Sequence, residues 1–283
     1  MRRIREPICV VGVGRSGTGM IARILRQHPN VAYLGEPRPV WMHGHAYRRD
    51  HALAAEDLTP RIARYIDGEF ARFLKRSGRG RFMEKTPSNC LRIPFIQALY
   101  PDVRIINIIR DGRAVVRSQL KLQERGPRRG LVRSRMRETR VWEWPAYLPM
   151  FLRTVWWTKV LGRTARFWGP KPPGWWQWLH LPPHVIAARQ WRSLVETSIR
   201  DGRVLPAENY LEIRYERLLA EPEAVVKDLV QFTGLDPSEE VVTFTRGYID
   251  PSRHTRWAGT LDDQQAREVE QEMQPLLEEL GYS

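Results

Sequence analysis

Cysteine is scarce in this chain of 283 residues, which contains only Cys9 and Cys90. Two cysteines, one inside an apolar run and one after a loop, support neither a disulfide framework nor a cysteine-based metal site. We therefore interpret both as small packed residues. His43, His45 and His51 include a His-x-His pair but lack a third well-spaced ligand, so we expect solvated helix histidines and no metal.

Long hydrophobic runs are also missing. The N-terminal region carries basic residues, but its apolar run is short and is broken by glycines, which fits neither a signal peptide nor a membrane anchor. We therefore expect a cytoplasmic protein, or an excised catalytic domain, and leave association with a membrane surface open. Internal repeats and long low-complexity linkers are absent too, so we expect a single domain over residues 1–283.

Acidic residues are few relative to basic ones. Lys and Arg number 46 against 32 Asp and Glu, which gives a formal net charge of +14. Such an excess favours anionic partners: a phosphorylated cofactor, an acidic acceptor, an anionic membrane surface or nucleic acid. A basic solvated surface without any partner is the alternative.

A glycine-rich turn stands out among the features that are present. Residues 8–25 combine a short apolar run, the turn GVGRSGT over residues 12–18 and a helical pattern. A strand that enters a helix through such a turn points free backbone N–H groups and the positive end of the helix dipole at one place. We therefore expect a ligand with a phosphate or a phosphate-like group; a tight turn without a ligand is the alternative.

Two known fingerprints compete for this turn. Gly12, Gly14 and Gly17 have the spacing of a dinucleotide-binding loop, and Glu36 lies roughly where a ribose-binding acid is expected. A nucleotide-triphosphate loop would need Lys before its Ser or Thr, but here Thr18 follows Gly17 directly. A triphosphatase is therefore disfavoured, whereas a nicotinamide or flavin oxidoreductase remains open.

Short apolar strands alternate with helical segments at both ends of the chain. The pattern predicts strands over 8–13, 31–35, 81–84, 103–109 and 210–215, and helices over 18–28, 60–76, 90–99, 111–122 and 222–233. This rhythm is typical of an α/β protein. We expect a P-loop-like three-layer fold, with a mostly parallel central sheet flanked by helices.

The middle of the chain, about residues 121–183, breaks this rhythm. Residues 121–140 hold eight Lys or Arg against two Glu, and eight of the 11 tryptophans lie between Trp142 and Trp178. We predict a helical insertion or lid. Aromatic residues among basic ones stack bases, sit at a membrane interface or wall an apolar acceptor pocket; a hairpin that simply packs its tryptophans on the domain is an equal alternative.

A second strand, turn and helix carries a second anion-binding signal. Arg110 follows the predicted strand 103–109 at its carboxyl end, where ligands of open α/β sheets bind, and Ser118 follows on the helix. A nucleotide with both 5′- and 3′-phosphates needs two such sites, whereas a nicotinamide cofactor needs one. A magnesium-dependent triphosphatase would show an acid at this strand end instead.

The two turns together resemble those of sulfotransferases that use 3′-phosphoadenosine 5′-phosphosulfate (PAPS). Residues 13–18 (VGRSGT) resemble the 5′-phosphosulfate loop, and residues 109–118 (IRDGRAVVRS) resemble the 3′-phosphate motif. Arg15, in place of the lysine of the cytosolic aryl branch, is closer to the tyrosylprotein and carbohydrate branches. Further matches are 27–29 (QHP), 35–36 (GE), 83–87 (MEKTP), 213–218 (IRYERL), 221–222 (EP) and 280–282 (LGY). The resemblance covers residues 8–118 and 189–282 and leaves out the Trp-rich middle.

The resemblance implies a role for each matching residue. Residues implied to bind the nucleotide are Arg15, Ser16, Gly17, Thr18 and Gly19 at the 5′-phosphosulfate, Arg110 and Ser118 at the 3′-phosphate, Tyr215 near the adenine, and Arg253 or Arg256 in a C-terminal loop. Glu36 is implied to be the general base, and Lys85 and Arg15 to contact the transferring group and the departing phosphate.

The implied function is in-line transfer of a sulfuryl group from PAPS, as cosubstrate, to a hydroxyl or an amine. The acceptor class stays open between a small molecule, a carbohydrate, a lipid and a peptide. Contact with an anionic membrane is compatible with this function, nucleic acid is not an expected partner, and no metal is required. A Rossmann-type oxidoreductase, in which Glu36 would bind ribose, and a basic module that binds nucleic acid or a membrane surface remain the alternatives.

Overall fold

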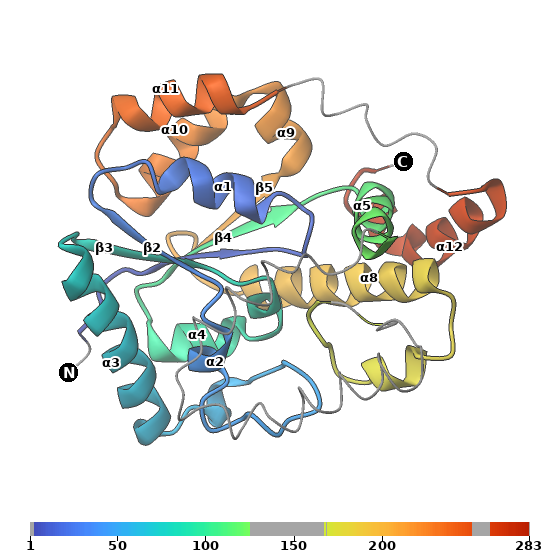
Figure 1. The fold of residues 1–283 in the computed structure, drawn as a ribbon, viewed down its shortest axis with the longest axis horizontal. Coiled ribbons are helices and arrows are strands. Elements are labelled where there is room, and N and C mark those ends of the chain that lie inside the picture. The colour runs from blue at the N-terminus through green and yellow to red at the C-terminus, as the bar shows by residue number, and fades with distance from the viewer. Residues whose placement is uncertain (1–2, 125–166, 168, 251–260, 283) are drawn as a thin grey trace.

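The described part of the chain is built around one five-stranded parallel sheet (Figure 1). The computed structural model describes residues 3–124, 167, 169–250 and 261–282. The strands are β1 (Ile8–Val11), β2 (Val31–Gly35), β3 (Arg81–Lys85), β4 (Arg104–Ile109) and β5 (Tyr210–Arg214). They lie in the order β2-β3-β1-β4-β5, and every neighbouring pair is parallel.

Helices connect the strands and follow the last of them. Their bounds are α1 (Thr18–Leu25), α2 (Arg38–Trp41), α3 (Pro60–Ser77), α4 (Ile93–Leu99), α5 (Gly112–Glu124), α8 (Pro183–Gly202), α9 (Tyr215–Ala220), α10 (Pro222–Thr233), α11 (Glu239–Tyr248) and α12 (Asp263–Glu279). Three short 3-10 helices are η1 (Ala55–Asp57), η2 (Pro87–Leu91) and η4 (Trp175–Trp178). None of the helices in the described ranges is long and apolar enough to cross a membrane.

Alternating side chains of the strands build two hydrophobic cores, one on each face of the sheet. Cys9 and Val11 of β1 join a core with α2, α3, α4, α5, α8 and α12. Ile8 and Val10 join a second core with α1, α9, α10 and α11. Figure 1 shows the sheet between these two helical layers. Strands buried on both faces explain the continuous apolar runs in the sequence.

Local signals set the ends of the helices. The Thr59 side chain accepts a hydrogen bond from the Ile62 N–H at the start of α3, and Pro60 occupies its first position. Gly78, with φ of 66°, ends this helix in the left-handed conformation that glycine adopts without a Cβ clash. Signals of this kind made the long helix between β2 and β3 visible in the sequence.

The structure confirms the predicted α/β class and the mostly parallel sheet. Each predicted strand and helix is present. The bounds of strand 31–35 and helix 222–233 are as predicted and those of the others are shifted, and the predicted helix 90–99 divides at Arg92 into η2 and α4. Tyr215 was predicted to be the last residue of a strand, but it is the first residue of α9. Both cysteines are buried, as predicted. Most of the predicted insertion at 121–183 lies outside the described residues.

Candidate functional site

All five strands end at the same edge of the sheet, and each delivers predicted site residues there. In sheet order from β2 to β5, these are Glu36 after β2, Lys85 at the end of β3, the turn 12–18 after β1, Arg110 after β4 and Tyr215 after β5. Ligands of open parallel sheets bind outside this edge, next to the strand where the order reverses. The strand β1, with β3 on one side and β4 on the other, occupies that position.

Close backbone approach explains two glycines of the turn after β1. Gly12 has φ of 143°, and a Cβ there would lie 2.5 Å from the Ile108 carbonyl oxygen. Gly17 has φ of 103°, and a Cβ there would lie 2.6 Å from Cδ2 of Tyr215. The turn therefore packs directly against β4 and the start of α9, which only glycine permits at these positions.

The start of α1 leaves backbone donors for a ligand. Gly17 is the N-cap and contributes no side-chain cap. Helix geometry gives the Thr18 and Gly19 N–H groups no intrahelical acceptor, and a Cβ on Gly19 would have no atom within 4 Å. Ser16 differs, because its N–H and its hydroxyl both donate to the Val13 carbonyl oxygen, at 3.0 and 2.6 Å. Ser16 thus shapes the turn from within.

The two predicted anion-binding turns meet in space. Nε of Arg15 donates to Oγ of Ser118 at 3.0 Å, and Nη1 of Arg110 donates to the Arg15 carbonyl oxygen at 3.1 Å. The Arg110 guanidinium lies 4.2 Å from the centre of the Tyr215 ring. Residues separated by more than 100 positions, including Arg15 and Ser118, therefore form one basic cluster.

Burial and a neighbouring cation shift the pKa of Arg15 in this cluster. Desolvation and then the positive charge of Arg110 lower the pKa of Arg15. A guanidinium still keeps its proton at any ordinary pH. Two adjacent cations that repel each other favour an anion between or beside them, as a phosphate site requires.

Glu36 lies between two cations at the β2 side of the edge. Its N–H donates to the Lys85 carbonyl oxygen at 3.1 Å, and its Oε1 lies 2.5 Å from Nζ of Lys85. Its Oε2 accepts a hydrogen bond from Nη2 of Arg38 at 2.6 Å. The Glu36 side chain is 29% exposed and that of Lys85 12% exposed. The carboxylate can therefore be reached from outside while both its oxygens are held.

Backbone conformation marks the same two places. Arg15 has φ of 80° and Glu36 has φ of 49°, in a region that residues with a Cβ rarely adopt. Such conformations cost free energy and concentrate at ligand-binding and catalytic sites. Here they aim a cation and a carboxylate at the carboxyl edge.

Sequence reasoning missed two residues of this site, Arg38 and Glu84. Glu84 is fully buried and accepts hydrogen bonds from Nε1 of Trp41 at 3.3 Å, Oγ1 of Thr86 at 2.6 Å and Nδ2 of Asn89 at 2.8 Å. Burial raises the pKa of its carboxyl group. Glu84 thus fastens α2 and η2 to β3 beside Lys85. A charged residue inside an apolar strand was the available signal.

The predicted setting of the three histidines is wrong. His43, His45 and His51 follow the end of α2 in a loop rather than on a helix, and each has a partner. His43 stacks on Tyr65 at 3.5 Å, His45 contacts the Asp57 carbonyl oxygen at 3.1 Å, and Nδ1 of His51 accepts from the Lys171 N–H at 3.2 Å. All three histidine rings therefore contact other residues of the protein, where solvated rings were expected. Across the described ranges, no group of three or more His, Cys, Asp or Glu residues is placed to hold a metal ion.

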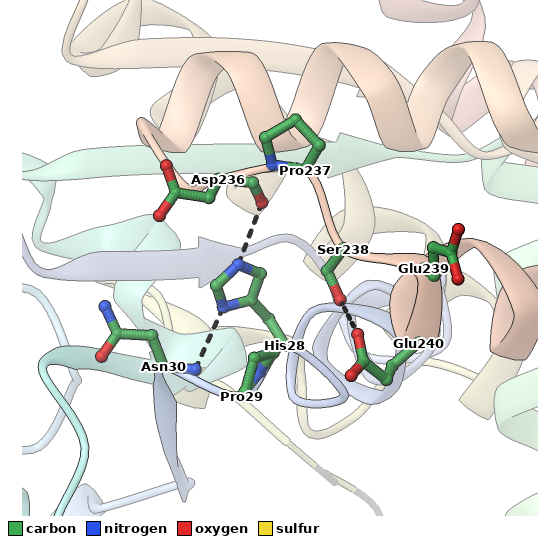
Figure 2. A pocket seen from close by; sticks show the side chains of 8 residues that line it. All are labelled: His28, Pro29, Asn30, Asp236, Pro237, Ser238, Glu239 and Glu240. Atoms are coloured by element: carbon green, nitrogen blue, oxygen red, sulfur yellow. Dashed lines mark hydrogen bonds between the residues drawn. The ribbon is translucent and has the colours of Figure 1, made fainter.

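A separate pocket lies on the opposite edge of the sheet (Figure 2). It is lined by His28, Pro29, Asn30 and residues 236–240, which are chain segments that follow α1 and α10. Both nitrogens of the His28 ring are engaged, with the Asp236 carbonyl oxygen at 3.0 Å and the Asn30 N–H at 3.1 Å. None of the predicted site residues lines this pocket. Arg253 and Arg256 lie outside the described residues.

Comparison with known proteins identifies the family. A sequence model described as "Sulfotransferase family" matches residues 7–148, half of the chain. The chain therefore belongs to the sulfotransferase family. It is 34% identical over 130 residues to a putative protein-tyrosine sulfotransferase of Caenorhabditis briggsae, covering 43% of this chain and 45% of that protein. It is 28% identical over 127 residues to the nodulation protein NoeE of Sinorhizobium fredii, covering 39% and 30%. The matches thus span less than half of either relative.

Solved structures share the fold along almost the whole chain. The sulfotransferase domain of the Synechococcus PCC 7002 olefin synthase superposes with a TM-score of 0.58 at 16% identity, covering 98% of this chain and 96% of that one. Mouse sulfotransferase SULT7A1 complexed with PAP (adenosine 3′,5′-bisphosphate) superposes with a TM-score of 0.51 at 14% identity, covering 97% of this chain and 85% of that one. These likenesses establish the architecture of the chain.

Proposed function

We propose that the protein is a sulfotransferase that uses PAPS as cosubstrate. The observation that carries this proposal is the order of groups along the carboxyl edge of the sheet. The turn after β1 lies between Lys85 on one side and Arg110 on the other. A donor bound with its 5′-phosphosulfate at this turn directs its 3′-phosphate to one side and its sulfuryl group to the other.

The nucleotide would be held by the basic cluster. Arg15 and the backbone N–H groups of Gly17, Thr18 and Gly19 bind the 5′-phosphosulfate, with Ser16 shaping the turn. Arg110 and Ser118 bind the 3′-phosphate, and Tyr215, which packs under Arg110, lies near the adenine. PAP in the mouse relative of the same fold supports this ligand. Arg253 or Arg256 would add a contact to the 3′-phosphate.

The chemical step follows from the cluster around Glu36. The carboxylate of Glu36 takes the proton of the acceptor hydroxyl or amine as that atom attacks sulfur. A bond forms between the acceptor and sulfur, the bond between sulfur and the 5′-phosphate oxygen breaks, and PAP leaves with the electron pair. Lys85 and Arg15 neutralise charge on the moving group and the departing phosphate.

Positive side chains supply the charge stabilisation in this proposal, so no metal has a part in it. The acceptor is a hydroxyl or amine of a small molecule, carbohydrate, lipid or peptide. One relative is described as a protein-tyrosine sulfotransferase, which supports a hydroxyl. We assign acceptor choice to residues 121–183 as an insertion in a single domain, because the motifs that resemble the family lie on either side of this segment. The family model itself reaches into the segment as far as residue 148.

Calorimetry with three nucleotides tests the proposal. PAP, adenosine 5′-monophosphate (AMP) and NADH are titrated separately into the protein at moderate salt, which limits nonspecific binding to a chain of charge +14. We expect PAP to bind at least about tenfold more tightly than AMP, because charged hydrogen bonds to the 3′-phosphate are worth roughly 1.5–3 kcal/mol. Equal affinity for PAP and AMP, or binding of NADH alone, would refute the proposal.

A further inference from the structure

The last residue that the structure describes reaches back to the Arg110 turn. Tyr282 follows α12, and its N–H donates to the Leu277 carbonyl oxygen at 2.9 Å. Its carbonyl oxygen accepts a hydrogen bond from Nη2 of Arg113 at 2.8 Å. The Arg214 guanidinium lies 5.2 Å from the centre of its ring. Tyr282 is therefore bonded to the helix α5, which begins two residues after Arg110.

The hydroxyl of Tyr282 continues this connection. It donates to Oε2 of Glu216 at 2.9 Å, while Oε1 of Glu216 accepts the Asp111 N–H at 3.1 Å. The Glu216 carboxylate thus joins Tyr282 to the backbone of Asp111, the residue directly after Arg110. Burial raises the pKa of the Tyr282 hydroxyl, which keeps it protonated as a donor.

Glu216 is also next in sequence to the residue that packs against the Arg110 side chain. The preceding residue is Tyr215, whose ring lies 4.2 Å from the Arg110 guanidinium and whose Cδ2 closes over Gly17. Glu216 is therefore hydrogen-bonded to the Asp111 N–H and directly follows Tyr215, whose ring packs against Arg110. Displacement of this carboxylate would move the arginine and its platform relative to each other.

Two further residues, Trp191 and Arg113, make hydrogen bonds that hold the turn. Nε1 of Trp191 donates to the Arg110 carbonyl oxygen at 3.1 Å. Arg113 donates to both carboxylate oxygens of Asp111, at 2.8–3.2 Å through its N–H groups, and to Glu270 of α12 at 3.0 Å. The Tyr282 hydroxyl donates to Oε2 of Glu216, the carboxylate oxygen that does not bind the Asp111 N–H, and thereby orients the carboxylate.

We propose that Tyr282 is a positioning residue for the 3′-phosphate site, acting through Glu216 and the Asp111 N–H to hold Arg110 over Tyr215. The inference rests on the proposed function, since it assigns a 3′-phosphate to Arg110. It predicts that Tyr282 contributes to nucleotide selectivity without touching the nucleotide.

The test compares Tyr282→Phe with wild type by calorimetry, using PAP and AMP as probes. Phe keeps the ring and removes the hydroxyl, which donates to Glu216 and also interacts with the Arg214 side chain. Loss of one hydrogen bond that orients a charged group should weaken PAP about threefold to tenfold and leave AMP within about twofold. Tyr248→Phe is the matched control, since its hydroxyl accepts from Nη1 of Arg23 at 3.0 Å, and no hydrogen bond joins it to Arg110 within the described residues. It should change neither affinity.

Other outcomes overturn the inference. If Tyr282→Phe binds PAP as wild type does, or weakens PAP and AMP equally, Tyr282 serves stability alone. Failure of wild type itself to prefer PAP would instead remove the proposed function, so the two failures are distinguishable. If Tyr282→Phe fails to fold, Glu216→Gln serves as the second variant. It keeps one acceptor oxygen and must show the same selective loss of PAP.

Discussion

The Glu36 side chain is held by two cations, Lys85 and Arg38. Lys85 and Arg38 each contact one of its carboxylate oxygens, at 2.5 and 2.6 Å. Such contacts hold the carboxylate in one orientation, which the proposed general base would require before the acceptor binds. Arg38 could not be singled out from its position in the sequence, because nothing in the motif indicates that it turns back onto Glu36.

Substitution of Glu36 separates catalysis from binding. Glu36→Gln keeps the shape but cannot take a proton, so we expect turnover to fall at least about 100-fold while PAP affinity stays within about threefold. Transfer of labelled sulfate from PAPS to a mixture of phenols, sugars and lipids measures the first, and calorimetry the second. Turnover that survives in the variant would show that Glu36 is not the base.

His51 gives a stability prediction with a defined sign. Burial, with help from Arg92, Lys171 and Arg38, lowers its pKa to about 3, from 6.5 in an unfolded chain. The unfolded chain therefore binds a proton below pH 6.5 that the folded protein does not bind until near pH 3. Its contribution to folding is complete above pH 6.5 and is lost as the pH falls through this window.

We expect wild type to lose about 1–2 kcal/mol more stability than His51→Asn between pH 7 and pH 5. Asn retains an oxygen that can accept from the Lys171 N–H. Urea unfolding at both pH values measures the difference. An equal loss in the two proteins would mean that His51 titrates normally in the folded state.

At the scale of elements, the turn after β1 depends on glycine at some positions and not at others. Gly17→Ala places a Cβ 2.6 Å from Tyr215 and forces φ of 103° on alanine, which should cost about 1–3 kcal/mol. Gly19→Ala is the matched control, because it lies in α1 with no atom within 4 Å of its Cβ. Its stability should stay the same or rise by up to about 1 kcal/mol. Equal stabilities in urea would contradict the geometry of the turn.

Local patterns predicted the elements whose cause is local. The strands β1 and β4 are apolar runs buried on both faces, and α3 has its own cap, proline and glycine, so these elements were visible in the sequence. The helices α2, α8, α9, α11 and α12 were not predicted, although α12 begins with a capping box of Asp262 and Gln265. The helices α8 and α12 also depend on distant contacts. Their burial against each other and against α5 is a tertiary effect, with Trp191 and Met273 in the same core. The ends of elements shifted for the same reason, as Tyr215 shows.

At the scale of the whole molecule, the sheet order turns separate motifs into one site. Sequence motifs identified Arg15, Glu36, Lys85 and Arg110 individually, but the order β2-β3-β1-β4-β5 could not be derived from them. The contacts of Glu84 and Tyr282 were equally invisible, since each joins segments far apart in the chain. The strand order and these side-chain contacts depend on residues far apart in the sequence, so local sequence patterns do not predict them.

The division of this site between a 5′-phosphosulfate turn and a 3′-phosphate turn is testable by one measurement. Arg110→Ala is titrated with PAP and with AMP, beside wild type, under the same salt conditions. We expect PAP affinity to fall at least about tenfold and AMP affinity to change by less than about threefold, because only PAP carries the phosphate that Arg110 would bind. Equal losses for the two nucleotides would contradict the two-site arrangement and the proposed function with it.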